Sequence, residues 1–406
     1  MHFDQARHVI LASLKPVGEA ERVPTPEALG RVAAEEVLAP EDLPRIPLSR
    51  VDGFAVRSSD AAQAAPGHPV RLRVGGTLRA GEAASARLEP GTVLAVATGA
   101  PLPAGADAVI PWEEAVILPR GSDVRSAQEV LLTRPAAQGG HVFQPGDQAR
   151  RGEVLLRPGD VVDLAALDTL LSQGIASLSV WRRPRVAILP TGSELVPWDA
   201  PEAAPHQARC SNAVPLARLV EQAGGVPVLL PIAPDDRGAL RQAILQALER
   251  SPDLLVTTGG ASHGPFDFTV AAVADLGEVL FADLAVSPGQ GTAFGLVQGV
   301  PVLCLPGGAL SARILFQVLG WPALRHLGGR EHVLQPRVRA RLTEGVRARP
   351  GTVRLVPACL RWDDSAGWLA TPRHAREFRC PGQWEGLLFI QEEAQETAEA
   401  ELWERP

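Results

Sequence analysis

The order of apolar and polar positions divides the chain into regions of β-strand spacing and one region where strands alternate with helices. From residue 184 onward, short apolar runs predict buried strands, and the segments between them have helical length and periodicity. The predicted strands are 185–189, 226–232, 254–256, 278–281 and 302–305, and the predicted helices are 211–223, 237–250, 268–275 and 309–327. This alternation predicts a doubly wound, mostly parallel sheet.

Outside that region the spacing favours smaller units. Residues 3–38 have the apolar positions Ile10, Leu11 and Leu14 at helical spacing, and 164–171 predict a further helix. Short β runs separated by glycine and proline turns fill most of the remainder. We therefore predict an α/β multidomain protein, with domains at 1–43 plus 139–180 (a split helical and mixed linker domain), 44–138 (β), 181–328 (doubly wound, ligand-binding) and 329–406 (C-terminal β).

Composition narrows the classes of partner. The 406 residues, 46% of them hydrophobic, have a net charge of −7, which argues against a nucleic-acid or anionic-membrane surface. No apolar run approaches the roughly 20 residues that span a bilayer. The N-terminus lacks the pattern of a signal peptide, so we expect a cytoplasmic protein. The four cysteines form no CxxC pair, which argues against a zinc knuckle or a redox dithiol.

The most informative segment is LLVTTGGASHGPFD, residues 254–267. A buried strand leads into Gly259 and Gly260, and a helix is predicted just beyond Asp267. A glycine turn between a strand and a helix typically presents bare backbone N–H groups to an anion. An acidic residue beside such a turn can hold a hard cation. The segment therefore predicts a site for a phosphorylated ligand, with a metal ion.

The turns after the neighbouring strands carry similar residues. Because ligands bind beyond the carboxyl ends of parallel strands, these turns are expected at one edge of the sheet. They contain Thr191, Gly192, Ser193 and Glu194; Asp235 and Asp236; and Pro306, Gly307, Gly308 and Ser311. Taken singly, Asp235 and Ser211 are typical helix N-caps, and a glycine pair is typically only a turn. Their coincidence at one edge favours a binding site for a phosphorylated ligand with Mg²⁺.

Other motifs are absent or weak. There is no GxxxxGK[ST] loop, no strand followed by GxGxxG, and no GxSxG elbow. In the β region, Asp52-Gly53 and Thr98-Gly99 are candidates for a second site, but their residue types alone favour simple hairpin turns.

Six segments, taken together, give these turns another meaning. VDGFAV, ATGAPLPAGADAVI, TGSELV, CSNAVPLARLVEQAGG, APDD and TGGASHGPFD resemble, in order, the motifs of the molybdopterin molybdotransferase family, which includes the gephyrin E domain. Ordered motifs spread over most of a chain are far more specific than any one of them. The resemblance implies an enzyme with four domains that forms an elongated homodimer and acts in molybdenum cofactor biosynthesis.

The resemblance also implies the reaction and the residues. The substrates are adenylylated molybdopterin and molybdate, and Mg²⁺ assists the release of AMP. Catalytic roles are implied for Asp52, Thr98, Glu194, Asp235 and Asp267, of which Glu194, Asp235 and Asp267 hold the metal. Ligand binding is implied for Thr191, Gly192, Ser211, Gly259, Gly260, Ser262, Gly264, Ser287, Gln290, Pro306, Gly307 and Ser311.

The chain departs from the family pattern at two turns. The family's KPGKP segment reads SPGQG here, so that Ser287 and Gln290 replace two lysines, and the family's PGNPVS turn reads PGGALS. A lysine within ~4 Å of an anion contributes several kcal/mol in a partly dry site, so anion binding is expected to weaken unless an arginine such as Arg313 or Arg45 compensates. Two alternatives stay open: a catalytically impaired scaffold or regulator, and a hydrolase of another phosphorylated small molecule. The retained acidic residues favour the transferase.

Overall fold

The computed structural model describes residues 1–84, 87–120, 123–260, 268–373, 386–391, 393–394 and 396–402. The chain forms two compact units. Unit 1 comprises Met1–Glu35, Pro158–Leu167 and Ser177–Pro406, and unit 2 comprises Glu36–Arg157 and Asp168–Ala176. The helix α3 (Leu164–Ser172) crosses the boundary between the two units. In the described part of the chain, no helix combines the length and the apolar character that a membrane span requires.

Unit 1 contains the predicted doubly wound sheet. Its strand order is β16 (Val226–Leu229), β13 (Arg185–Pro190), β17 (Leu254–Thr258), β21 (Val300–Leu305), β20 (Ala293–Val297) and β18 (Gly277–Ala282). The first four strands are parallel, and the last two form an antiparallel edge. The α/β prediction is confirmed. Strand β20 was not predicted, because its short run carries Gly295 at the centre, and glycine weakens the strand signal.

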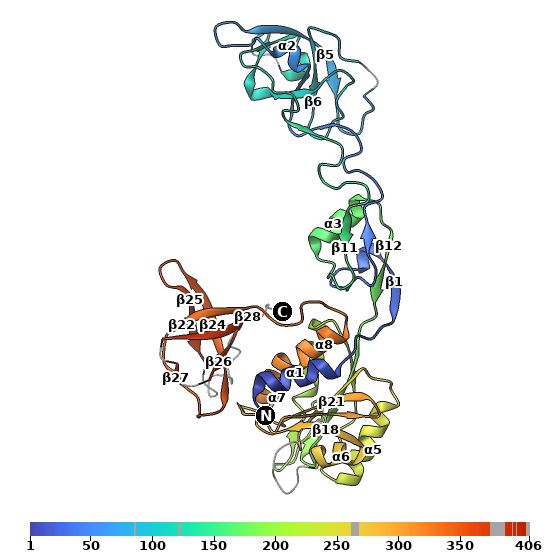
Figure 1. The fold of residues 1–406 in the computed structure, drawn as a ribbon, viewed down its shortest axis with the longest axis vertical. Helices are drawn as coiled ribbons and strands as arrows, with labels where there is room; N and C mark the ends of the chain where they lie inside the picture. Colours follow the sequence, from blue (N-terminus) through green and yellow to red (C-terminus); the bar gives the residue numbers. More distant parts are fainter. Residues whose placement is uncertain are drawn as a thin grey trace. The chain divides into compact units, whose positions relative to one another are not determined.

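Helices cover both faces of this sheet (Figure 1). On one face, Val186 and Ile188 of β13 pack in a core with α1 (Phe3–Ser13), α4 (Ala213–Gln222), α7 (Ala309–Leu315) and α8 (Trp321–Leu327). On the other, Ala187 and Leu189 pack with α5 (Arg237–Leu248) and α6 (Thr269–Leu276). Successive residues of a strand point to opposite faces, so β13 is apolar throughout because both of its faces are buried.

The long C-terminal helix of the sheet domain is nearly continuous. A π-helical turn at Phe316–Gly320 joins α7 to α8, so the three segments together span the predicted helix 309–327.

The helical expectation for residues 3–38 is wrong beyond Ser13. Helix α1 buries Phe3, Ala6 and Ile10 on one face and ends before Pro16, a residue that disfavours helix at the position preceding it. The chain then forms β1 (Ala20–Pro24), antiparallel to β12 (Ser177–Trp181), and the turn η1 (Thr25–Glu27).

The C-terminal part of unit 1 is a small closed sheet. Strands β24 (Val353–Asp363), β25 (Gly367–Pro372), β22 (Arg337–Leu342), β28 (Thr397–Leu402) and β26 (Gly386–Ile390) pair in turn, and β26 pairs back with β24. The short strand β19 (Val286–Ser287) adds to β24. A separate pair joins β23 (Val346–Arg347) to β27 (Glu393–Ala394).

Unit 2 is built on a six-stranded sheet of its own. Its order is β7 (Ala108–Pro111), β4 (Gly53–Val56), β6 (Thr92–Val96), β5 (Val70–Leu78), β9 (Glu129–Leu132) and β8 (Ala115–Leu118). Two small pairs, β2 (Val37–Leu38) with β11 (Val154–Leu156) and β3 (Leu48–Ser49) with β10 (Val142–Phe143), complete its strands. Its short helical turns are α2 (Ser58–Ala61), η2 (Trp112–Glu114) and η3 (Val124–Ser126). The division of the chain into four domains stays a prediction.

Candidate functional site

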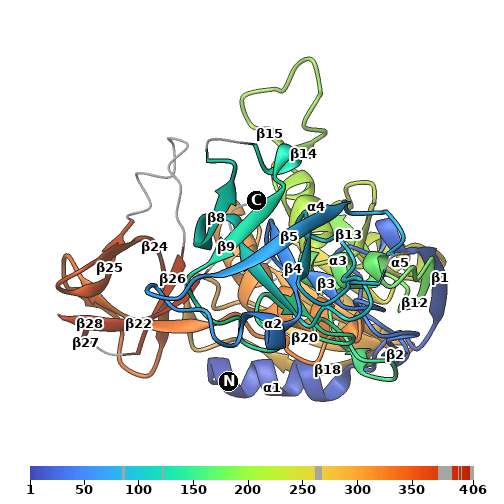
Figure 2. The same cartoon turned by 90° about the horizontal axis from the view of Figure 1, so that it is seen from above.

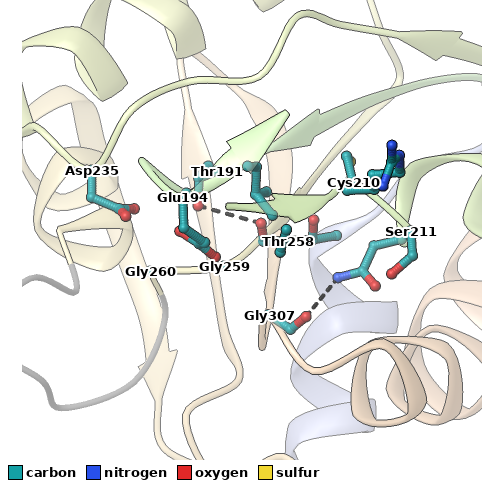
Figure 3. Close-up of a pocket in the computed structure, with 14 residues that line it drawn as sticks. Thr191, Glu194, Cys210, Ser211, Asp235, Thr258, Gly259, Gly260 and Gly307 are labelled. Carbon is teal, nitrogen blue, oxygen red and sulfur yellow. Dashed lines mark hydrogen bonds between the residues drawn. The ribbon is translucent and has the colours of Figure 1, made fainter. Parts of the chain in front are cut away.

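A polar cavity of about 380 Å³ lies at the carboxyl ends of the parallel strands of unit 1 (Figure 3). The turns after β13, β17 and β21 line it, together with the segment 208–212 that precedes α4. The cavity brings together the following residues that the sequence predicted: Thr191, Gly192, Glu194, Ser211, Asp235, Gly259, Gly260 and Gly307. This is the edge at which a doubly wound sheet binds ligands.

Asp235 is fixed by the turn that follows β13. Its Oδ2 accepts a hydrogen bond from the Ser193 N–H at 2.9 Å, and the Asp235 N–H donates to the Ser193 hydroxyl at 2.9 Å. The N-cap of α5 is instead Asp236, whose Oδ1 accepts from the Ala239 N–H at 2.8 Å. The alternative that Asp235 caps this helix is therefore wrong, and its carboxylate faces the cavity.

The glycine turns line the cavity, but some of their N–H groups are already engaged. Gly259 donates to the Leu305 carbonyl at 3.1 Å, and Gly192 donates to the Ala233 carbonyl at 3.0 Å. The expectation of bare N–H groups is therefore wrong at these two positions, because the parallel ladder continues past the strand ends. Glycine is needed for a different reason: at Gly259 (φ +107°) a Cβ would lie 2.3 Å from the Thr191 carbonyl oxygen.

Two buried polar atoms face the cavity without a described partner. The Asn212 side chain donates through Nδ2 to the Gly307 carbonyl at 2.7 Å, while its Oδ1 has no hydrogen-bond partner among the described residues. The hydroxyl of Thr258, a residue that is 1% exposed, likewise has no hydrogen-bond partner among the described residues. Buried polar atoms are nearly always hydrogen-bonded, so such orphans mark a place for a ligand or water.

Sequence reasoning did not single out Asn212 and Thr258. Ser211 was weighed as the cap of α4, but the N-cap residue is Asn212, and its side chain makes no capping hydrogen bond. In the sequence, Asn212 looks like an ordinary candidate for a helix N-cap. Only the structure shows that its side chain binds the Gly307 carbonyl instead of capping the helix.

The charged side chains at the cavity are of both signs. Figure 3 shows Glu194 and Asp235 on one side of it and Cys210 and Ser211 on the other. Arg209 also lines the cavity and was not predicted; its guanidinium donates to the Ala200 carbonyl at 2.9 Å. Within the described ranges, no three His, Cys, Asp or Glu residues gather closely enough to hold a metal ion. The expected third metal ligand, Asp267, and the expected binding residues Ser262 and Gly264 lie outside the described residues.

Four other predicted binding residues do not line this cavity: Ser287, Gln290, Pro306 and Ser311. Ser287 lies in β19 and pairs with Arg354 of the C-terminal sheet. The Gln290 carbonyl accepts a hydrogen bond from the Leu284 N–H at 2.7 Å.

The chain has a single lysine, Lys15, and the side chains of Ser287 and Gln290 are uncharged. Any positive charge near the site must therefore come from arginines. An adjoining cavity of about 260 Å³ shares Ser211 and Asn212 with the site and is also lined by Arg313. Burial lowers the pKa of the Arg313 guanidinium. Arg45, the other arginine considered, is in unit 2 and forms an ion pair with Glu41.

Asp52 and Thr98 meet within unit 2. Asp52 Oδ1 accepts hydrogen bonds from the Thr98 N–H at 2.7 Å and from the Thr98 hydroxyl at 3.0 Å. Asp52 precedes β4 and Thr98 follows β6, two strands that pair directly. The carboxylate therefore fixes the turn after β6, as a structural role requires, and both residues are exposed.

Two protein-family models match the chain. Residues 1–174 match the family described as "MoeA N-terminal region (domain I and II)". Residues 187–326 match the family described as "Probable molybdopterin binding domain", which contains the whole polar cavity.

Similar proteins cover nearly the full length. "Molybdopterin molybdenumtransferase 2" of Mycobacterium tuberculosis is 33% identical over 394 residues, which are 94% of each chain. "Molybdopterin molybdenumtransferase" of Synechococcus elongatus is 32% identical over 330 residues, or 80% of each chain. A crystal structure of the molybdopterin biosynthesis MoeA protein from Pyrococcus horikosii superimposes with a TM-score of 0.76 at 31% identity, covering all of both chains. The chain therefore belongs to the molybdopterin molybdenumtransferase family.

Proposed function

We propose that this chain is an active molybdopterin molybdenumtransferase. It takes molybdenum from molybdate, inserts it into adenylylated molybdopterin and releases AMP, in molybdenum cofactor biosynthesis. The observation that carries the proposal is the polar cavity at the sheet edge, where Glu194, Asp235, Asn212 and Thr258 converge. A scaffold has no need of two carboxylates and of two buried polar atoms that lack a hydrogen-bond partner among the described residues, all in one cavity.

The donors at the cavity fit Mg²⁺. This ion is usually bound through one or two carboxylates together with phosphate oxygens of the substrate, and it needs no complete protein cage. Glu194 and Asp235 supply such oxygens, and Asp267 is the proposed third ligand. When bound, Mg²⁺ would neutralise charge on the phosphate oxygens as AMP departs.

The other residues of the cavity orient the ligand. The Ser193 N–H holds the Asp235 carboxylate in one orientation, so the residue pays little conformational entropy when a cation binds. The amide of Asn212 is anchored on Gly307, which directs its Oδ1 to accept from a ligand hydroxyl or amino group. The Thr258 hydroxyl can donate to a phosphate oxygen. Arg209 and Arg313 supply the positive charge that lysines supply elsewhere in the family.

Other parts of the proposal rest on the resemblance. They are a homodimeric state, ligand contacts by Ser287, Gln290, Pro306 and Ser311, and catalytic roles for Asp52 and Thr98. A proposed cytoplasmic location and the proposed lack of a nucleic-acid or membrane partner rest instead on the N-terminal sequence and the net charge of −7. The hydrogen bonds from Thr98 give Asp52 a turn-forming role that is compatible with a further catalytic one.

The direct test is a turnover assay. Purified protein is incubated with adenylylated molybdopterin, molybdate and Mg²⁺, and both AMP release and molybdenum incorporation are followed, with a chelator-treated control. The proposal expects Mg²⁺-dependent release of AMP together with molybdenum insertion. No AMP release contradicts the proposal, and AMP release without incorporated molybdenum identifies a phosphohydrolase instead.

A further inference from the structure

A second cavity, of about 560 Å³, adjoins the polar one. Gly192, Leu195 and Cys210 line both cavities, so the turn after β13 forms a wall between them. The second cavity has a different character, since prolines and large apolar side chains make up most of its lining. They include Pro197, Trp198, Val214, Leu229, Pro231 and Ile232.

Two of these side chains are exposed to an unusual degree. Trp198 is 62% exposed and Leu229 is 51% exposed, although both line the same cavity. Single exposed apolar residues are common on protein surfaces and need no explanation. Two large ones on one concave surface, next to a polar cavity, are typical of a binding site.

The loop that carries Trp198 is also linked to the polar cavity. Trp198 lies in a loop of unit 1 that runs from β14 (Leu195–Val196) to β15 (Ala208–Arg209), two strands that pair with each other (Figure 2). Arg209, which lines the polar cavity, donates to the carbonyl of Ala200 within that loop. The N–H of Ala200 in turn donates to the Pro197 carbonyl at 3.1 Å. The backbone of the loop that carries Trp198 is therefore hydrogen-bonded to Arg209, a residue that lines the polar cavity.

We propose that the apolar cavity binds the flat heteroaromatic ring of the same ligand whose phosphates occupy the polar cavity, with Trp198 stacking on that ring. This inference rests on the proposed function, which supplies a ligand with phosphate groups between ring systems. An indole offers a large apolar face and loses little entropy when it stacks. A cavity of 560 Å³ has the volume typical of small-molecule sites. Adenine and pterin rings share the required chemistry.

The test compares ring-bearing and ring-free probes. Isothermal titration calorimetry measures the dissociation constants of AMP, ribose 5-phosphate and 6-hydroxymethylpterin with wild-type protein, Trp198→Ala and Trp198→Phe. Stacking predicts that Trp198→Ala binds AMP or the pterin at least about tenfold more weakly. Trp198→Phe is expected to stay within about threefold of wild type, and ribose 5-phosphate is expected to bind all three proteins alike. The probe whose dissociation constant rises in Trp198→Ala identifies the ring, adenine or pterin, that binds in the apolar cavity.

A matched control is available in the same chain. Trp362, in β24, is also 62% exposed and lies in the C-terminal sheet, and Trp362→Ala is expected to leave all three dissociation constants unchanged. An unchanged affinity of Trp198→Ala for both ring probes overturns the inference. So does equal weakening of ribose 5-phosphate, which would mean that the loop only shapes the polar cavity. A change of oligomeric state on gel filtration without a change in ring affinity also overturns it, since the apolar surface then covers a second copy.

The two proposals fail separately. If wild-type protein releases no AMP from adenylylated molybdopterin yet binds a ring probe in a manner that depends on Trp198, the ring site stands and the transferase fails. If turnover is normal and ring binding is indifferent to Trp198, the transferase stands and the ring site fails.

Discussion

At the scale of single residues, two neighbouring aspartates have different roles. Asp236 caps α5, whereas Asp235 is bound to Ser193 and lines the cavity. We expect Asp235→Asn to fold normally, because the amide oxygen can still accept from Ser193. Its Mg²⁺-dependent AMP release should fall by about 10- to 100-fold, the range for losing a charge-assisted contact. Initial rates as a function of Mg²⁺ concentration measure this effect.

Asp236→Ala is the matched control for that experiment. Loss of an N-cap lowers the free energy of unfolding by about 1 kcal/mol, and turnover of the folded protein should stay near that of wild type. If Asp236→Ala impaired turnover as much as Asp235→Asn does, the assignment of Asp235 to the site would be wrong.

Gly259 is the second residue whose role the structure defines. In Gly259→Ala the new methyl group would lie 2.3 Å from the Thr191 carbonyl, and φ is +107°. Gly299 has a φ of +81° with nothing within 4 Å of an added Cβ, so Gly299→Ala measures the backbone strain alone. We expect Gly299→Ala to lower the free energy of unfolding by about 1 kcal/mol and Gly259→Ala by clearly more than that. Urea titration compares the two, and equal losses would argue against the close approach at Gly259.

At the scale of elements, a partly buried ion pair joins the sheet domain to the segment that enters it. Arg182, just after β12, binds both carboxylate oxygens of Asp253 at 2.7 and 2.9 Å, and Asp253 also accepts from the N–H of Arg185 at the start of β13. These hydrogen bonds, chiefly those to Asp253, raise the pKa of Arg182. Asp253→Asn should therefore lower the free energy of unfolding by about 2 kcal/mol, measured by urea denaturation.

A second arginine pair provides the comparison. Arg237 binds Asp275 with similar geometry, but its side chain is 56% exposed. Because water screens an exposed pair, Asp275→Asn should have a much smaller effect than Asp253→Asn. An equal effect would show that burial is not what distinguishes the two pairs.

At the scale of the whole molecule, ionisation of one buried thiol is expected to affect the free energy of unfolding at high pH. The chain has no tyrosine and a single lysine, so few groups titrate between pH 9 and 11. Burial raises the pKa of the Cys304 thiol from 9.0 to about 11. The unfolded chain therefore releases this proton at lower pH than the folded chain. The stabilising contribution is complete below pH 9 and is lost as pH rises through about 11.

This pH dependence is measurable against Cys304→Ala. Between pH 9 and 11 the wild-type protein should lose up to about 3 kcal/mol more unfolding free energy than the variant, which has no thiol to ionise. Urea titrations at several pH values give this slope directly. Parallel curves for the two proteins would mean that the thiol titrates normally.

The order of apolar and polar residues was enough to predict the repeating elements and the edge of the sheet at which the cavity lies. Apolar runs of strand length between amphipathic helices require a doubly wound sheet, because only that arrangement buries both faces of strands such as β13. Strand ends followed by Thr191-Gly192, Asp235 and Gly259-Gly260 located the cavity, since parallel strands bring their carboxyl ends to one edge. The family resemblance is confirmed by the match over residues 187–326 and by a relative that is 33% identical over 394 residues.

The roles of those residues depend on contacts between distant parts of the folded chain. Sequence cannot tell which of Asp235 and Asp236 caps a helix, because both have the same chemistry and the choice depends on Ser193, 42 positions away. Nor can it show that the N–H groups of Gly192 and Gly259 are engaged, that Asn212 reaches Gly307, or that Ser287 joins the C-terminal sheet. Periodicity is a property of neighbouring residues, whereas hydrogen-bond partners depend on which distant strands become neighbours in space.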